Sequence, residues 1–331
     1  MNRDFHFDTK DRKKYQVPLP IITTYIRQVT TDPIMKLLLT FLLPIISSAF
    51  TLSDKSVSNL LMDYAAQISA LKVQTSKLVG DITVEPYAND VFYLRYALSG
   101  DEGESQLKET LDWRLGSGKH ICHAATKAIA EATSDGTWKN GPVLAGAPHS
   151  KLIGKYLTPS TCLTTTTSQG DLIYCIRAGK INDVELMASL DNIEQLVDFF
   201  VYCKEVNALV ANQRSLDSNK LICLVTANDL SGVKLIGGDA NFRNALSKAS
   251  KTASKLYPSL NGPTLLLNLP TILGALAKLF TPLFPPEVRK RLKFEQGPLA
   301  KVKDLMEVSY GGSGRVEFLA AIDQMVYKEV K

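Results

Sequence analysis

The sequence lacks the markers of several common protein classes. Its five cysteines are scattered, odd in number and without any CxxC spacing, so neither a disulfide framework nor a zinc ribbon is indicated. No Asn-x-Ser/Thr acceptor site occurs anywhere in the 331 residues, which disfavours a secreted protein. We therefore expect reduced and mostly buried thiols.

Charge of either sign is also modest. The net charge is +5, from 38 basic and 33 acidic residues. This excess is far below the basic footprint of a nucleic-acid-binding protein, although it is compatible with a preference for anionic surfaces. With 45% hydrophobic and 21% charged residues, the composition is that of a globular chain rather than of a disordered or multi-span membrane protein.

Motifs for catalysis are missing too. A phosphate-binding loop in the stretch GSGKH would need a glycine five residues before Gly118 and a Ser or Thr after the lysine, but the chain has Trp113 and His120 there. No G-x-S-x-G nucleophile motif is present, and His149 is the last of only four histidines. The sequence thus predicts a protein that is not an enzyme and has no catalytic residues.

Two further groups of polar residues could form a functional site, but a structural role explains each of them. His120, Cys122 and His123 are metal-ligand types, but no second cluster completes a tetrahedral set. We interpret them as the polar beginning of a helix and predict no metal site. The carboxylates Asp198 and Glu205 are interpreted as part of a solvated helix face.

An apolar stretch near the N-terminus begins at Met35 and reads MKLLLTFLLPIISSAFTLSD. It has the charged start, apolar centre and small-residue exit of a cleaved signal peptide, but only if translation begins at Met35. In that case the Ser-Ala-Phe junction resembles the presequences of plastid proteins. The alternative is a helix, broken near Pro44, that packs on the domain or lies on a membrane. Residues 1–54 are thus predicted to be an N-terminal extension with a candidate targeting segment at 35–50.

The rest of the chain divides into two predicted parts. Residues 55–120 carry apolar side chains at steps of three or four, which predicts a helical lobe. Residues 121–331 alternate short apolar runs with helical patterns, which predicts an α/β fold with a mostly parallel sheet flanked by helices. The strands are expected at 171–178, 220–227 and 264–270, and the helices at 183–213 and 240–256.

Two stretches before the first predicted strand are expected to be irregular. Five glycines between Gly116 and Gly146 indicate a loose connection. The run TTTT at 164–167 is interpreted as the approach to the first strand.

The stretch 261–294 reads NGPTLLLNLPTILGALAKLFTPLFPPEVRKRLKF. Residues 271–281 are apolar on nearly every side of a short helix, so one stripe packed on a core does not account for them. At about 1.5 Å rise per residue, this helix is too short to cross a bilayer core of about 30 Å. Either it is completely buried, or it lies between an internal cavity and a membrane.

Basic residues directly after this helix favour the second explanation. Each contributes about 1 kcal/mol near an anionic lipid surface. The predicted membrane-docking residues are Arg289, Lys290, Arg291 and Lys293.

Several short motifs lie between residues 85 and 315: YLRYAL and LDWR in the helical part, DLSG after the second strand, and then YPSLNG, NLP, PLF and YGG. Together these motifs resemble the CRAL-TRIO family of lipid-transfer domains. Each motif is short, but their order and spacing together are specific. The resemblance implies a sheet that encloses one lipid in a pocket, closed by a gate helix at 271–281.

The resemblance also implies which residues bind the ligand. The three strands would supply the floor of the pocket, and the gate helix would supply its apolar side chains. The floor residues are Tyr174, Ile176, Leu224, Thr226, Leu267 and Leu269, and the gate residues are Ile272, Leu273, Leu276 and Phe280. The sequence alone does not say which side of each strand faces the ligand.

Three positions depart from the pattern of family members that bind phosphatidylinositol. Ala97, Leu98 and Ser259 stand where those members have Arg, Lys and Glu, and only Arg291 keeps a cation. A phosphoinositol headgroup would lose most of its charge-assisted contacts here. A different ligand is therefore expected, such as another phospholipid, a sterol, or an isoprenoid or carotenoid-like molecule.

The predicted function is binding of a single lipid and its exchange with membranes, by a monomer that uses no cofactor and binds no nucleic acid. The alternative is a lipid-sensing scaffold that presents its ligand to a partner protein, and a third hypothesis is a lipid-modifying hydrolase that depends on His149 or a serine. We expect a cytoplasmic protein that associates transiently with an anionic membrane surface. A plastid location is the alternative if residues 35–49 are a cleaved signal.

Overall fold

The computed structural model describes residues 56–136, 138–158, 161–166, 172–230, 232, 238–267 and 292–294. At residues 140, 163–166, 263–267 and 292–294 it describes the backbone alone. The N-terminal extension 1–54, the predicted gate at 271–281 and the predicted docking residues Arg289, Lys290 and Arg291 lie outside the described residues.

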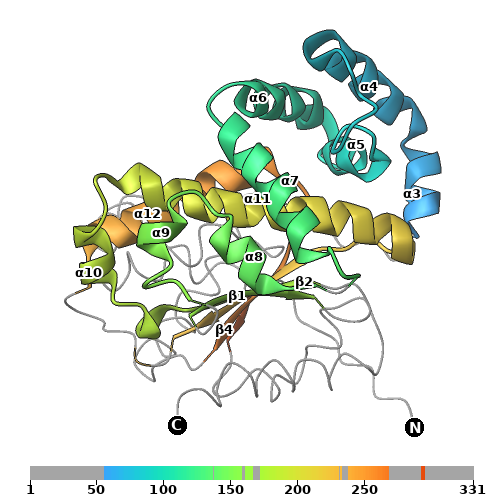
Figure 1. Ribbon diagram of the computed structural model, residues 1–331. Coiled ribbons are helices and arrows are strands. Elements are labelled where there is room, and N and C mark those ends of the chain that lie inside the picture. The colour runs from blue at the N-terminus through green and yellow to red at the C-terminus, as the bar shows by residue number, and fades with distance from the viewer. Residues whose placement is uncertain are drawn as a thin grey trace, which may run out of the picture.

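A lobe of α-helices opens the described chain and lies at the top of Figure 1. Its members are α3 (Val57–Asp63), α4 (Ala65–Val79), α5 (Asp90–Ala97) and α6 (Gly103–Leu115), with the 3-10 turn η2 (Gly100–Glu102). Ser56 and Asn89 cap α3 and α5, because their side-chain oxygens accept hydrogen bonds from backbone amides of the first turn. The lobe has an apolar cluster of its own, in which Val91, Leu94 and Leu107 are completely buried. The predicted N-terminal helical lobe is confirmed.

The stretch predicted as a loose connection is largely helical. It forms α7 (Lys119–Ala132), α8 (Asn140–Ala145) and α9 (Ser150–Ile153). The side of α7 that packs against α11 is made mainly of Ala125, Ala128 and Ala132. Because alanine side chains are small, they give a weak apolar pattern in the sequence. The glycines around them therefore led to the prediction of a loose connection instead of helices. The predicted domain boundary at residue 120 falls in the first turn of α7, and the boundary itself stays a prediction.

Gly118, in the stretch GSGKH, has a structural reason to be glycine. A Cβ atom built on it would lie 2.1 Å from the ring of Trp113. The close approach of this ring requires a residue without a side chain. The glycine is thus explained by packing, in agreement with the rejection of a phosphate-binding loop.

Five strands form one sheet in the order β1-β2-β3-β4-β5 within the described residues. They are β1 (Cys162–Thr166), β2 (Leu172–Arg177), β3 (Leu224–Asp229), β4 (Asn261–Leu267) and β5 (Leu292–Phe294). Every neighbouring pair is parallel except β1 and β2, which are antiparallel. The predicted α/β fold with a mostly parallel sheet is confirmed.

The helices of this part of the chain follow β2 and β3. They are α10 (Asp183–Ala188), α11 (Ile193–Ser218) and α12 (Ala240–Leu256), with the 3-10 turn η3 (Ala178–Lys180). The single helix predicted at 183–213 is two helices, because Asn192 ends the first pattern and caps the amides of Glu194 and Gln195. The helix predicted at 240–256 coincides with α12.

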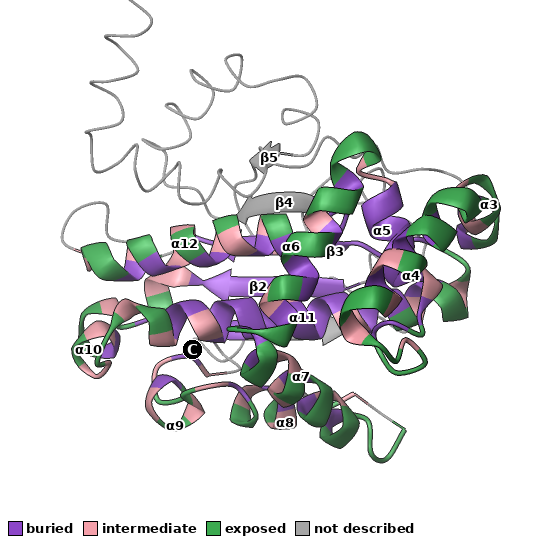
Figure 2. Ribbon diagram, turned by 90° about the horizontal axis from the view of Figure 1, so that it is seen from above, coloured by how far each residue is buried: buried purple, intermediate pink, exposed green. Residues whose placement is uncertain are grey.

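Helix α11 is the centre of the molecule. It runs between the helical lobe and the sheet, and its neighbours α7, α12 and α5 contact it on different sides. Of its 26 residues, 15 are buried, and Figure 2 shows the helix and strand β2 largely in the colour of buried residues. A helix buried on so many sides has no continuous polar face.

Candidate functional site

The two faces of the sheet carry different side chains, because successive residues of a strand point to opposite faces. On β2, Leu172, Tyr174 and Ile176 belong to the apolar cluster that includes α11. Leu224 on β3 belongs to the same cluster. These residues therefore face the layer of helices, which Figure 1 shows gathered on one side of the sheet.

The alternate residues of the same strands face the other way. Ile173 and Cys175 of β2 and Val225 and Ala227 of β3 are all buried, with at most 4% exposure. None of them belongs to either apolar cluster of the described residues. The sheet thus presents a second apolar face that the helices α7, α11 and α12 do not cover.

The predicted floor residues are divided by this geometry. Tyr174, Ile176 and Leu224 lie on the helix-covered face, and Thr226 is half-buried on the same side of β3 as Leu224. Leu267 ends strand β4, where the structure describes the backbone alone. Leu269 and the four gate residues Ile272, Leu273, Leu276 and Phe280 lie outside the described residues, as do the docking residues other than Lys293, which is placed in β5 by its backbone.

Tyr174 has polar partners among the helices. Its hydroxyl accepts a hydrogen bond from the Cys162 thiol at 3.4 Å, and the Lys204 amine lies 5.3 Å from the centre of its ring. Lys204 comes from α11 and approaches Asn261 Oδ1 at 3.5 Å. Lys204 keeps some exposure, but burial still lowers the pKa of its amine to about 8. These contacts join α11 to the sheet, and they link the polar side chains to one another.

A buried ion pair lies at the carboxyl ends of β2 and β3, on the sheet face that points away from α11. Arg177 and Asp229 are the last residues of β2 and β3 and are partners in the parallel register. The Arg177 Nε atom lies 3.4 Å from Asp229 Oδ2, and both side chains are almost completely buried. By alternation they follow Cys175 and Ala227 on the same face, so this apolar face carries charge at the carboxyl ends of its strands.

Arg95 connects the helical lobe to the rest of the protein. From α5, its Nε atom donates to Asn212 Oδ1 at 2.6 Å, and its Nη atoms donate to the carbonyl oxygens of Ser259 and Ile222, each at 2.7 Å. Ser259 has a φ of 56°, a left-handed conformation that is strained for a residue other than glycine. The guanidinium group of Arg95 is therefore committed to one side-chain amide oxygen and two backbone carbonyl oxygens.

A second buried cation lies nearby. The Arg114 Nη1 atom of α6 donates to Glu205 of α11 at 2.9 Å, and both side chains are almost fully buried. Burial alone would lower the pKa of Arg114, but the Glu205 carboxylate outweighs this effect and the pKa is raised. Glu205 is completely buried, so its assignment to a solvated helix face is wrong.

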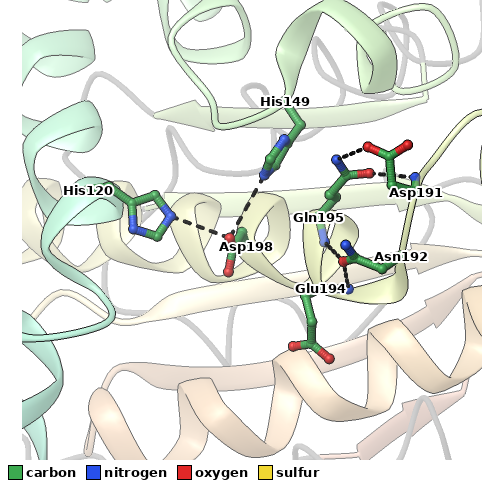
Figure 3. A network of polar contacts seen from close by, with 7 residues as sticks. All are labelled: His120, His149, Asp191, Asn192, Glu194, Gln195 and Asp198. Atoms are coloured by element: carbon green, nitrogen blue, oxygen red, sulfur yellow. Dashed lines mark hydrogen bonds and ion pairs between the residues drawn. The ribbon is translucent and has the colours of Figure 1, made fainter.

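Two histidines distant in sequence meet at Asp198, as Figure 3 shows. The His120 Nε2 atom of α7 lies 3.3 Å from Asp198 Oδ2, and His149 Nε2 lies 3.9 Å from the same oxygen. His149 has a φ of 59°, again a left-handed conformation. His120 stands in the first turn of α7, so the interpretation of a polar helix start is correct for this residue.

This cluster lacks the parts of a catalytic or metal site. In the described part of the chain, neither imidazole has a serine or cysteine as a hydrogen-bond partner. No three His, Cys, Asp or Glu side chains are arranged to hold a metal ion there. Cys122, in the same turn, has its pKa raised to about 12 by burial, which keeps its thiol protonated.

Within the described ranges, every helix is too short or too polar to pass through a bilayer.

Comparison with known proteins identifies one segment. No curated protein matches the chain. Residues 160–312 match the CRAL/TRIO domain. This confirms the resemblance carried by the sequence motifs, and with it a relation to lipid-binding proteins in general.

The segment that matches the CRAL/TRIO domain includes the whole described sheet, β1 to β5, with helices α10 to α12. Helices α3 to α9 precede it. Among solved structures, the chain is similar to the crystal structure of Sfh5, with 15% identity and a TM-score of 0.48. That likeness covers 76% of this chain and 86% of the other.

Proposed function

We propose that the protein binds one hydrophobic lipid against the sheet face that points away from α11, and exchanges this lipid with membranes. The observation that carries the proposal is the alternation in β2 and β3. Ile173, Cys175, Val225 and Ala227 form an apolar face within the segment that matches the CRAL/TRIO domain, yet they join neither apolar cluster of the described residues. A lipid chain is the chemical partner that suits such a face.

This proposal revises the floor predicted from the family resemblance. Three of the predicted residues, Tyr174, Ile176 and Leu224, pack with α11, which argues against contact with a ligand. We propose that the neighbouring residue on each strand takes this role instead. The gate residues Ile272, Leu273, Leu276 and Phe280 and the docking cations keep the roles proposed from the sequence.

The mechanism is physical and requires no covalent step. Moving a lipid through water costs about 0.8 kcal/mol for each exposed CH₂ group, so a lipid leaves its bilayer only if an apolar cavity receives it. Cations after the gate would bring the protein to an anionic surface. There the gate helix can open against lipid instead of water, which stabilises the open state only at the membrane.

The ligand we propose has no phosphoinositol headgroup. The guanidinium of Arg95 makes three hydrogen bonds within the protein, so it has little capacity left for a phosphate. Its neighbours Ala97 and Leu98 bring no charge, and Ser259 supplies only a carbonyl oxygen to Arg95. This leaves other phospholipids, sterols and isoprenoid or carotenoid-like molecules.

The first experiment is extraction of the protein as purified from cells, followed by mass spectrometry. We expect one lipid class in roughly equimolar amount with the protein, without enrichment of phosphatidylinositol. Extracts that contain no lipid above the level of a matched control protein would contradict the proposal.

The second experiment measures lipid transfer between vesicles. Leu276→Asp combined with Phe280→Asp should abolish transfer while the far-ultraviolet circular dichroism stays unchanged. The control combines Met62→Asp with Leu78→Asp, two apolar residues exposed on the helical lobe at 69% and 42%, and should transfer normally. Normal transfer by the gate variant rules out this gate. Slow transfer by the unaltered protein, together with ligand-dependent capture of a partner, would favour the presenting scaffold.

The third experiment tests docking and location. Reversal of charge at Arg289 and Lys290 should weaken binding to anionic vesicles more than binding to neutral vesicles, because only the first depends on Coulomb attraction. Equal effects on both would contradict electrostatic docking. We also propose a cytoplasmic protein, and a mature N-terminus near Phe50 would favour the plastid alternative instead.

A further inference from the structure

A groove of about 800 Å³ lies on the helical side of the protein, away from the proposed lipid face. Residues of α7 and of the C-terminal half of α11 line it, together with Trp138. Its apolar lining consists of Ile129, Trp138, Leu209 and Val210. A groove of this size with an aromatic and three aliphatic side chains is suited to an apolar segment.

The rim of the groove is charged but balanced. Glu85 and Asp217 face Arg214 and Lys220 around it. Burial raises the pKa of Glu85 and lowers that of Arg214, so both are partly withdrawn from water. A rim with two charges of each sign does not select an anionic or a cationic ligand, which favours a nearly neutral apolar occupant.

The N-terminal extension is attached at this rim. Asn219 follows α11 in a left-handed conformation, with a φ of 52°. Its carbonyl oxygen accepts a hydrogen bond from the Val57 amide at 3.1 Å, and its side-chain oxygen accepts one from the Ser58 amide at 2.8 Å. The residues on either side of Asn219, Ser218 and Lys220, both line the groove. The chain that precedes Ser56 therefore leaves the fold at the edge of the groove.

We infer that the groove is the docking site of the chain's own apolar segment 35–50. Phe50 is six positions before Ser56, so the connection reaches at most about 20 Å, and it starts at the rim of the groove. Lys36 is the only charged residue of the segment, in keeping with the balanced rim. The short connection makes the contact intramolecular, at an effective concentration in about the millimolar range, so even a weak contact is occupied.

Docking of the segment 35–50 would change which apolar side chains the protein exposes. Seated in the groove, its leucines and Phe41 are withheld from water and from other membranes. Release of the segment would expose an apolar surface next to the helical lobe. This inference does not depend on the proposed lipid function, and its tests require no lipid.

The first test uses Trp138 as a reporter. The chain has two tryptophans, so Trp113→Phe leaves Trp138 as the single fluorophore in the full-length protein. We expect the acrylamide quenching constant of Trp138 to rise about threefold when Phe41→Asp and Leu42→Asp are added, because the segment then leaves the groove. Equal quenching with and without these substitutions overturns the inference, since the groove is then open or covered by something else.

The second test reads the segment itself. Trypsin cleaves after Lys36, and the docked segment should be cut slowly. Leu209→Asp, inside the groove, should speed this cleavage at least fivefold. Leu216→Asp is the matched control, on the same helix and 40% exposed but outside the groove, and should leave the rate unchanged. Identical rates for all three proteins overturn the inference, and so does a mature protein whose N-terminus lies beyond residue 50.

Discussion

The two faces of the central sheet differ in what covers them. Leu172, Tyr174 and Ile176 of β2 pack into the large cluster around α11, while Ile173 and Cys175 of the same strand are buried outside it. One strand thus carries both a structural face and the face that we propose for the ligand. The lesson is that burial alone does not assign a residue to stability or to binding. The following predictions separate these roles, in decreasing order of the expected effect.

The largest effect should come from Glu205→Ala on the helical side. The substitution leaves Arg114 buried without its partner, which costs about 3–5 kcal/mol of the free energy of unfolding. Urea denaturation measures this loss, and the bound lipid should not change. Asp198→Ala on the same helix is the control, because its carboxylate is at the surface and should cost less than about 1 kcal/mol. Similar losses for the two variants would contradict the assignment of Glu205 to the core.

A matched pair on β2 compares the faces directly. Ile176→Ala should lower the free energy of unfolding by about 2–5 kcal/mol, because it opens a cavity against α11. Ile173→Ala should cost clearly less in lipid-free protein, since the ligand side has no described cluster to disrupt, and should reduce lipid retention instead. Denaturation with and without lipid measures both. If the two variants lose equal stability and bind lipid normally, the two faces do not have separate roles.

Lys204 provides a prediction about pH. Burial lowers the pKa of its amine from 10.5 to about 8, so the unfolded chain holds this proton more tightly than the folded protein. The stability contributed at this site therefore rises as pH increases from about 8 to 10.5. Lys204→Met should stabilise the protein at pH 7, and this gain should shrink by about 1 kcal/mol at pH 9. A gain that is constant or larger at pH 9 would contradict the direction of the shift.

The smallest effect concerns thiol reactivity. Cys175 lies on the proposed ligand face, whereas Cys162 and Cys203 lie in the helix-covered cluster, and all three are buried. Removal of lipid should make Cys175 accessible to a maleimide while the other two stay unlabelled in folded protein. Peptide mass spectrometry of labelled samples gives the result. Labelling of all three at the same rate would indicate unfolding rather than an emptied pocket.

Much of the architecture could be predicted from the sequence. Helix α12 has its predicted bounds, and β2 differs from its prediction by one residue at each end. Strand β3 begins at Leu224 rather than at residue 220, and β4 begins at Asn261 rather than at residue 264. These elements have strong apolar patterns, and their ends are set by pairing with neighbours, which the local sequence does not record.

Other elements were missed for physical reasons. β1 is an edge strand in which three of five residues are threonine, so its pattern lacks apolar alternation. β5 has only three residues, too few for any period to be visible. The alanine side chains of α7 are apolar but small, so they give a weak pattern in the sequence. They allow α7 to pack closely against α11.

The site was harder to predict than the fold. In LIYCIR every residue of β2 is buried, so the sequence does not distinguish the face toward α11 from the face away from it. The distinction follows only from the position of the helices. The same limit applies to His120 and His149, whose approach to Asp198 depends on the unexpected helix α7 and on the left-handed backbone of His149.

The guanidinium of Arg95 has a mechanical consequence. Its three hydrogen bonds end on α11, on the segment before β3 and on the segment before β4, so a single side chain ties the lobe of helices to three other parts of the chain. A lysine could satisfy only one of these acceptors well. One buried guanidinium thus fastens the lobe of helices to the centre of the fold, and its loss would break all three of these contacts at once.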